Sequence, residues 1–514
     1  MNATNSSSPT GNIPQVTPSH PISTGAIPVV PPAESELQDA VAHRPTSERL
    51  DRADFLLLAV MVISAFILIL NETLLGVALP VLMEDLHIPA TTAQWSSTGF
   101  MLTMAVVTPA SGFIISRFSI RTVFVGAMTV FSAGALMAGI APTFSLLLVG
   151  RILQAMGTGI IMPLLMTTMM RLVPPAKIGR AMGLIGMVIS AAPALGPTVS
   201  GVILGFASWR WLFLSVLPIG LVALMVGARL APTSLPEGGA DQRLDVLSMV
   251  LSTIGFGGLV LGLSTLGAGS EHGGSELPVS PWVIVAVAAI VLAVFVARQL
   301  QLQKDSSPFM DLRVFTYFPF VLTVLMSSVA MGVLLGSSVM LPMYTLNVLG
   351  LDALATGLLL LPGGILSALM SPLVGNLSDK FQPRMLVLPG AVLFSASIWM
   401  MTFFDEHTHR WFVLCVYLVV SLTVPFLNTP LMGVGLGALP QRLYSYGSSA
   451  LTTVQQVASA AATALFIALM GVGMTAHGGS GKEAFAAGVH LAFLVAAFIS
   501  LAAIMVAVLV PKKK

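Results

Sequence analysis

The sequence is poor in charge and in cysteine, and each shortage excludes a class of protein. Only 9% of its 514 residues are charged, against about 25% in an ordinary soluble domain. The single cysteine, Cys415, excludes a disulfide framework within the chain and any multi-cysteine metal site. No phosphate-binding Gly-rich loop with a lysine is present, so there is no ATPase motor. The eight histidines are scattered. We therefore expect no enzyme, no cofactor and no metal, and a net charge of +2 points to no nucleic-acid partner.

Long apolar runs make up most of the chain. Hydrophobic residues are 56% of the sequence, and the mean hydropathy is +0.93. From residue 54 onward we count fourteen runs of about 20 residues, each long enough to cross a bilayer. Residues 1–53 are instead rich in Ser, Thr, Pro and Asn, which predicts a disordered cytoplasmic tail. The pattern predicts an all-α polytopic membrane protein.

The basic residues between the runs predict an orientation. With the N-terminus inside, 19 of the 23 basic residues fall on the inside and three on the outside, which are Arg210, Arg410 and Lys482. The inside residues are Arg44, Arg49, Arg52, Arg117, Arg121, Arg171, Lys177, Arg180, Arg229, Arg243, Arg298, Lys304, Arg313, Lys380, Arg384, Arg442 and Lys512–Lys514. Because cytoplasmic loops carry the excess of Lys and Arg, we expect both termini in the cytoplasm and an even number of spans.

An internal repeat divides the chain. Residues 109–121 read PASGFIISRFSIR, and residues 372–384 read PLVGNLSDKFQPR. The matching pairs, each offset by 263 residues, are Pro109 and Pro372, Gly112 and Gly375, Arg117 and Lys380, Phe118 and Phe381, and Arg121 and Arg384. Parallel repeats of this kind are a transporter architecture. We predict six-helix bundles at 54–231 and 314–514, with two additional helices and their linkers at 232–313.

One carboxylate lies deep in an apolar run. Glu72 stands in Ile67–Pro80, ILILNETLLGVALP. A charge at mid-membrane costs roughly 2.5–3.5 kcal/mol on insertion scales, so such residues are functional by default. Burial disfavours the charged form, and we expect Glu72 to gain and lose a proton near neutral pH. A structural role at a helix end, or beside a neutralising partner, is the alternative.

Residues 54–510 resemble the major facilitator superfamily and, within it, the fourteen-helix drug:proton antiporters, which are multidrug efflux permeases. The first run carries LNETLLGVALP, with Asn71 where many members have Asp. The resemblance implies the major facilitator fold, two six-helix bundles plus two central helices. It also implies proton-coupled export of small molecules from a bacterial cell. We assign Asn71 to the substrate cavity.

The repeated loop resembles the superfamily's cytoplasmic gating motif. The first copy holds Gly112, Arg117 and Arg121, but Ser116 replaces the motif's Asp and Ser119 its second Gly. The second copy keeps the acid; its gating residues are Gly375, Asp379, Lys380 and Arg384. A carboxylate among guanidinium groups can latch two bundles through charge-assisted bonds. The alternative is that these basic residues serve only to hold the orientation.

Arg151 lies within the fourth run, in GRILQAMGTG, which resembles the family's intramembrane-arginine motif. The family implicates this arginine in proton transfer, so we name Glu72 and Arg151 as the proton-coupling residues. An arginine in the membrane needs a carboxylate, carbonyls or water. A direct or water-bridged pair with Glu72 is one solution, and capping by backbone carbonyls is the other. We place Gln154, one turn further on, in the substrate cavity.

Two further segments carry the resemblance. The fifth run, GMVISAAPALGPTVSGVIL, resembles the antiporter motif that characterises exporters, with generic helix packing as the alternative. Its motif residues are Gly186, Pro193, Gly196, Pro197 and Gly201. Trp209–Gly220 resembles the sixth-helix signature, although Trp209 could be an interfacial anchor. Gln455 and Gln456 lie within a later run, as substrate contacts or as helix–helix hydrogen bonds.

The sequence therefore predicts a monomeric, proton-coupled exporter of hydrophobic or amphipathic drugs, working by alternating access in the cell membrane. A dedicated exporter of a metabolite, lipid or peptide with the same fold is the first alternative. A passive channel or a non-transporting receptor fits the repeat and Glu72 less well. Its expected partners are a small-molecule substrate, protons and the lipid bilayer.

Overall fold

The computed structural model describes residues 51–235, 245–267, 279–304, 308–479 and 481–510. The predicted tail, apart from its last three residues, lies outside the described residues, as do the basic residues Arg44, Arg49, Arg243 and Lys512–Lys514. In the described part of the chain all regular elements are helices, and fourteen spans are long and apolar enough to cross a membrane. This confirms the predicted all-α class and the predicted count of spans.

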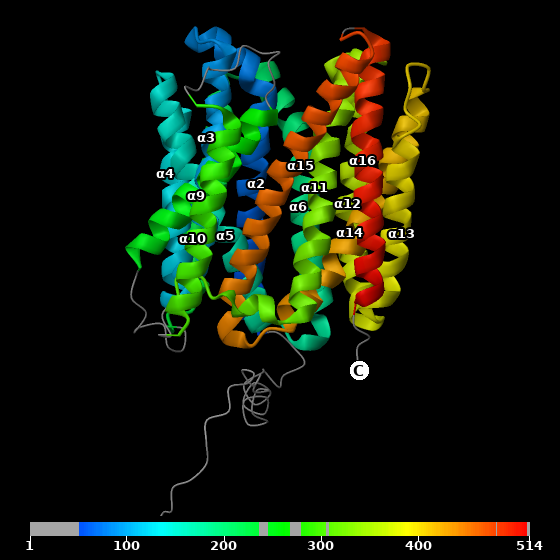
Figure 1. The fold of residues 1–514 in the computed structure, drawn as a ribbon. Helices are drawn as coiled ribbons and strands as arrows, with labels where there is room; N and C mark the ends of the chain where they lie inside the picture. Colours follow the sequence, from blue (N-terminus) through cyan, green and yellow to red (C-terminus); the bar gives the residue numbers. More distant parts are fainter. Residues whose placement is uncertain (1–50, 236–244, 268–278, 305–307, 480, 511–514) are drawn as a thin grey trace, which may run out of the picture. The chain divides into compact units, whose positions relative to one another are not determined.

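The spans follow one another along the chain (Figure 1). The first six spans are α2 (Arg52–Leu86), α3 (Ala90–Arg117), α4 (Ile120–Gly139), α5 (Phe144–Leu172), α6 (Ile178–Phe206) and the pair α7 (Trp211–Leu214) and α8 (Val216–Leu230). The next two are α9 (Val246–Gly267) and α10 (Pro281–Leu302). The last six are α11 (Phe318–Asn347), α12 (Ala353–Lys380), α13 (Pro383–Met401), α14 (Arg410–Gly437), α15 (Tyr444–Ala476) and α16 (Lys482–Leu509).

Prolines inside the spans do not end these helices. Pro80 lies within α2, Pro109 within α3, and Pro163 within α5. Such breakers are tolerated in membrane helices because neighbouring groups satisfy the freed backbone. The helices therefore run on through the points where a soluble helix would be expected to stop.

Two sets of helices pack mainly among themselves. In the first, α2 contacts α3, α5, α6 and α8, and α4 contacts α5 and α8. In the second, α11 contacts α14, α15 and α16, and α13 contacts α14 and α16. We call these sets the N-terminal half (α2–α8) and the C-terminal half (α11–α16).

Two seams join the halves. Along one, α3 packs against α15, and along the other, α6 packs against α12. The seams are related by the internal repeat, because α3 and α12 carry its two copies. The partners match as well: a short 3₁₀ turn precedes each of them, η1 (Pro175–Lys177) before α6 and η5 (Gln441–Leu443) before α15.

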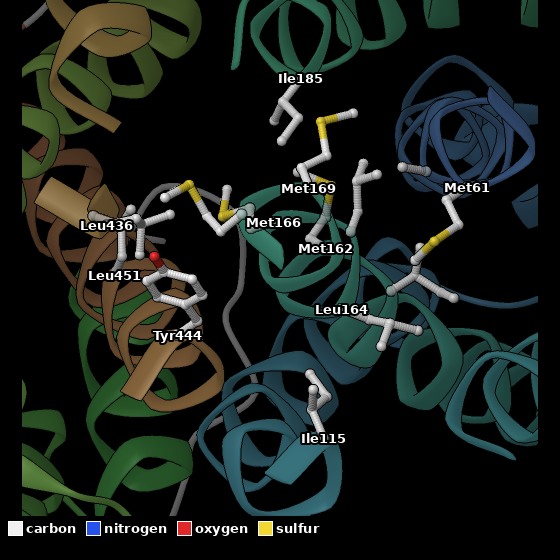
Figure 2. Packing of buried hydrophobic residues seen from close by; sticks show 14 of the residues in the cluster. Met61, Ile115, Met162, Leu164, Met166, Met169, Ile185, Leu436, Tyr444 and Leu451 are labelled. Carbon is white, nitrogen blue, oxygen red and sulfur yellow. The ribbon is translucent and has the colours of Figure 1, made fainter. Parts of the chain in front are cut away.

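Methionine-rich packing fills the space between the halves near these seams. Met162, Met166 and Met169 of α5 lie between Met61 of α2 and a group of side chains from α14 and α15 (Figure 2). That group contains Leu436, Tyr444 and Leu451. Methionine is flexible and fills irregular gaps, so this contact between the halves can repack at low cost.

Candidate functional site

The buried guanidinium of Arg151 organises a polar cluster inside the N-terminal half. Its Nη1 donates to the side-chain oxygens of Asn71 on α2 and Gln154 on α5, each at 3.1 Å. Its Nε donates to the carbonyl of Ser96 on α3 at 3.4 Å. The guanidinium carbon lies 4.1 Å from the centroid of the Phe100 ring, a cation–π geometry. Arg151 is only 1% exposed, so these groups stand in for the water it has lost.

These bonds fix the orientation of the two amides. Arginine has donors and no acceptor, so Asn71 and Gln154 must each turn the carbonyl oxygen toward Arg151. Their amide nitrogens are left buried, without a hydrogen-bond partner among the described residues. The cluster is therefore rich in donors and short of acceptors, an arrangement that favours an incoming carboxylate or carbonyl oxygen.

Glu72 stands beside this cluster without joining it. The residue is half-buried, and its carboxylate makes no hydrogen bond or ion pair within the described part of the chain. The charges of Glu72 and Arg151 interact electrostatically. Glu72 thus lies next to a donor-rich cluster, and its own acceptor oxygens are not engaged by the described residues.

The direct pairing of Glu72 with Arg151, one of the two solutions open from the sequence, is not what the structure shows. Arg151 bonds to two neutral amides and one backbone carbonyl. Sequence reasoning missed Ser96 and Phe100, since neither carries a signal that separates it from any other Ser or Phe in an apolar run. Gln154 could be found, because it lies one helical turn from Arg151.

Gln456 of α15 lies away from the arginine. Gln456 donates to the Thr108 hydroxyl of α3 at 3.4 Å, and its side-chain oxygen is buried with no partner among the residues that the structure describes. A Cβ at Gly159 would lie 3.3 Å from the same hydroxyl. Gly159 is eight residues beyond Arg151, or about 12 Å along α5. Gln455 is half-buried. Gln456 therefore joins the halves at a different depth from Arg151.

The α6–α12 seam is closed by the second copy of the gating motif. Asp379 accepts the N–H groups of Gly179 at 2.7 Å and Arg180 at 3.0 Å. These are first-turn donors of α6, which has no side-chain cap of its own, and a carboxylate also complements the positive end of the helix. Gly375 lies so close that an added Cβ would be 2.5 Å from the Gly179 carbonyl. The sequence named guanidinium partners for Asp379 and missed these backbone donors.

The α3–α15 seam carries a neutral counterpart. Ser116, in the place of the motif's Asp, lies 3.1 Å from the Tyr446 hydroxyl in the first turn of α15. A Cβ at Gly112 would lie 3.1 Å from the Ser449 side chain, and the Ser449 hydroxyl donates to the Thr108 carbonyl at 2.6 Å. The two copies of the motif thus occupy equivalent seams with different chemistry.

The basic residues of the motif lie at the margin of these seams. Arg121 and Lys380 are exposed, and Arg117 and Arg384 are half-buried. The backbone N–H of Arg121 donates to the Pro232 carbonyl at 3.2 Å. Arg117 lies 5.9 Å from the centroid of the Phe118 ring.

The antiporter motif on α6 divides into close contacts and an open position. Gly186 faces Thr429 and Ser371 of the C-terminal half, and Gly196 lies directly against Thr73 of α2. Gly201 is exposed, and an added Cβ there would meet nothing within 4 Å. Close packing therefore does not explain Gly201. Pro193 and Pro197 are exposed and α6 continues through both.

Trp209 is a buried structural residue and not an interfacial anchor. It is 1% exposed, and its indole N–H donates to the Asp85 carboxylate at 2.9 Å. Arg210 forms an ion pair with the same carboxylate at 3.0 Å. This group joins the end of α2 to the start of α7. Trp211, which is 54% exposed, is the residue in position to meet lipid.

A family model and several known proteins match most of this chain in sequence. A family model described as Major Facilitator Superfamily matches residues 61–463. Lincomycin resistance protein LmrB of Bacillus subtilis (strain 168) is 37% identical over 452 residues, covering 86% of this chain and 92% of that protein. The uncharacterized MFS-type transporter YcnB of the same organism is 38% identical, covering 87% and 92%. A multidrug resistance protein B homolog of Mycobacterium tuberculosis (strain ATCC 25618 / H37Rv) is 27% identical, covering 85% and 82%.

Solved structures agree at the level of the fold. The human organic anion transporter MFSD10 matches with a TM-score of 0.63 at 12% identity, covering 88% of this chain and 99% of that one. The proton:xylose symporter XylE matches with a TM-score of 0.60 at 14% identity, covering 90% and 96%. At such identities the likeness concerns the fold alone, and it confirms the fold class expected from the sequence.

Proposed function

The chain belongs to the Major Facilitator Superfamily, and from this premise we propose that it exports hydrophobic or amphipathic compounds across the cell membrane in exchange for protons. As a member of a transporter family it is a multi-pass membrane transporter and not an enzyme. The narrower assignment, to the fourteen-helix drug:proton antiporters, is supported by the fourteen spans and by relatives named for lincomycin and multidrug resistance.

The observation that carries the proposal is the place of Glu72 beside the Arg151 cluster. A protonated Glu72 is neutral and needs no charged partner, and the described residues form no hydrogen bond or ion pair with it. Once it loses its proton, the carboxylate can accept from the buried amide nitrogens of Asn71 and Gln154, or from Arg151. Loss of the proton from Glu72 and rearrangement of the hydrogen bonds and charge around Arg151 then occur in the same step.

The direction of transport comes from alternating access, in which the site opens to one side of the membrane at a time. The bonds across both seams lie where the motif residues are, so the molecule is closed at that end. We assign this end to the cytoplasm, with both termini inside, because the basic residues gather there. Protonation of Glu72 from outside neutralises the cavity and releases a cationic or amphipathic substrate, and deprotonation to the cytoplasm resets the carrier. The unit is a monomer, with the bundles bounded at 54–231 and 314–514.

The test is drug-driven proton movement in inverted membrane vesicles, with ethidium and lincomycin as probes. Glu72→Gln keeps the shape of the side chain and removes its titration. We expect this variant to bind ethidium while proton release falls at least tenfold. Glu84→Gln is the matched control, because Glu84 is an exposed carboxylate near the end of the same helix. Normal coupling in Glu72→Gln would remove Glu72 from the mechanism.

A dedicated exporter of a metabolite, lipid or peptide is the second candidate, since the same fold and the same proton site would serve it. The two candidates differ in their range of substrates. Overexpression that protects cells against several unrelated drugs supports the broad exporter. Loss of secretion of one compound in a deletion strain, with no change in drug tolerance, supports the dedicated one.

A further inference from the structure

The two additional helices, α9 and α10, form one rigid hairpin. Glycines on α9 let it lie directly on α10: an added Cβ would be 2.6 Å from Leu292 at Gly255 and 2.6 Å from Val285 at Gly262. Just before α9, Asp245 holds Arg298 of α10 through two bonds, Nε to Oδ2 at 2.7 Å and Nη2 to Oδ1 at 2.9 Å. Small residues at a helix interface and a bidentate ion pair both favour one fixed arrangement.

The segment that follows the hairpin is fastened to it by a buried glutamine. Gln299 is fully buried; its Nε2 donates to the Ser248 hydroxyl at 2.7 Å, and its Oε1 accepts the N–H of Met310 at 3.0 Å. One side chain thus connects α9, α10 and the linker. Because both the nitrogen and the oxygen of the Gln299 side chain are bonded, Met310 is held against the hairpin.

The hairpin is anchored to the N-terminal half. Phe309 of the linker stacks on Phe113 of α3 with ring centroids 5.9 Å apart, and it meets Phe295 of α10 edge-on at 6.4 Å. A second contact lies about two turns before Phe113 on α3, where a Cβ at Gly257 of α9 would be 3.2 Å from Val106. Aromatic pairs add to the stabilisation given by their buried area. These contacts attach the hairpin to α3 near its gating end and again near its middle.

The hairpin also covers a seam. α9 packs against α15 as well as α3, so it lies along the line where the two halves meet (Figure 1). In alternating access the halves rock against each other, and a cover fixed to both would oppose that motion. Beyond Phe309 the linker continues through the 3₁₀ turn η4 (Leu312–Thr316) to α11, the first helix of the C-terminal half.

We propose that α9 and α10 are a lipid shield that moves with the N-terminal half, slides against α15, and covers the α3–α15 seam throughout the cycle. The turn η4 takes up the relative motion. The proposal rests on the alternating access of the proposed function, but not on proton coupling or on the compound carried.

Paired cysteines in a Cys415→Ser background test it. Gly257→Cys with Val106→Cys ties α9 to α3, and Thr167→Cys with Ser448→Cys, whose hydroxyls lie 2.7 Å apart across the halves, is the comparison. After oxidation we expect ethidium transport within twofold of the reduced protein for the first pair, and a loss of at least tenfold, restored by reductant, for the second. Equal losses for both pairs would overturn the proposal.

A second readout needs no transport. We expect disulfide formation between Thr167→Cys and Ser448→Cys to slow severalfold when Asp379→Asn weakens the α6–α12 closure, while the α9–α3 pair keeps its rate. If the α9–α3 rate falls in parallel, the hairpin does not travel with α3 and the proposal is wrong. Should Gly257→Cys with Val106→Cys fail to reach the membrane, Leu102→Cys replaces Val106→Cys, because Leu102 lies 3.6 Å from the same Cβ position.

Discussion

The carboxylate of Asp379 on α12 accepts the backbone N–H of Gly179 on α6 at 2.7 Å, so one half of the molecule supplies the helix cap of the other. The equivalent position in the other seam is Ser116, whose hydroxyl lies 3.1 Å from that of Tyr446. A charged bond contributes about 1.5–3 kcal/mol and a neutral one about 0.5–1.5 kcal/mol. The contact at Asp379 is therefore expected to contribute more to closure than the equivalent contact at Ser116.

Replacing Asp379 by Asn tests this difference. The amide keeps one acceptor oxygen but loses the charge and one of the two bonds. We expect closure at this end to weaken by about 1–2 kcal/mol, a shift of about 5- to 30-fold toward the open state. The measurement is maleimide labelling of Ser449→Cys, because Ser449 is buried in the α3–α15 seam when this end of the molecule is closed. Lys380→Gln, next to Asp379 but exposed, should leave labelling unchanged; equal labelling in both variants would contradict the assignment.

Placing Asp at position 116 should have the opposite effect. The side chain faces the first turn of α15, which has no side-chain cap of its own. A carboxylate there would accept a charge-assisted bond from the Tyr446 hydroxyl, which lies 3.1 Å from the Ser116 oxygen, and would stand near the positive end of a helix. We expect Ser116→Asp to hold the seam closed, lowering Ser449→Cys labelling and slowing transport severalfold. Ser116→Asn, which has the same shape without the charge, should change both much less. Faster labelling in the Asp variant would show that the two seams are not equivalent.

Glycine-to-alanine substitutions test whether a motif glycine is required because two helices pack closely at that position. At Gly375 a methyl group would lie 2.5 Å from the Gly179 carbonyl, which is backbone and cannot move aside. We expect Gly375→Ala to spread α6 from α12 and to lower transport at least tenfold. Gly201→Ala is the control, since it belongs to the antiporter motif but has open space around it. Its transport should be near that of the parent, and a severe loss would mean that Gly201 acts through backbone freedom.

The Asn71–Arg151 bond should show itself in stability. Asn71→Leu removes an acceptor from a fully buried arginine and leaves a donor unsatisfied, at a cost of about 1–3 kcal/mol. Asn71→Asp replaces the neutral acceptor by a charged one at the same 3.1 Å contact. We therefore expect the melting temperature in detergent to fall for the Leu variant and to be held or raised for the Asp variant. The reverse order would mean that the buried site does not tolerate a second carboxylate near Glu72.

The fold could be predicted from the sequence because its signals are long and repeated. Fourteen apolar runs, each spanning a bilayer, leave little choice of element, and the repeat at residues 109–121 and 372–384 relates the two halves. The seams were less accessible, because Gly179 and Tyr446 act through a backbone N–H and a hydroxyl that no sequence pattern marks. The place of Asp379 was predictable; its partner was not.

The candidate site could be predicted only in part, because some of its residues carry a signal in the sequence and others do not. Glu72 and Arg151 stand out as charges in apolar runs, and Gln154 follows from helical spacing. Which acceptor Arg151 takes depends on rotamers and on the approach of α3, so Ser96 and Phe100 emerged only from the structure. For Trp209 the sequence left an interfacial anchor open as the alternative, and the structure instead buries it with its indole N–H bonded to Asp85.

The ion pair that closes the α9–α10 hairpin should be insensitive to physiological acidification. Hydrogen bonds from Arg298 lower the pKa of Asp245 from 3.8 to about 2. A depressed pKa stabilises the folded protein fully above the ordinary value and loses its effect as the pH falls through about 2. We expect the melting-temperature difference between the parent and Asp245→Asn to be constant from pH 8 to about 5 and to shrink only below about pH 4. A difference that vanished between pH 7 and 5 would mean that the carboxylate is not held by Arg298. A constant difference means that Asp245 keeps Arg298 bound, and the hairpin closed, across this pH range.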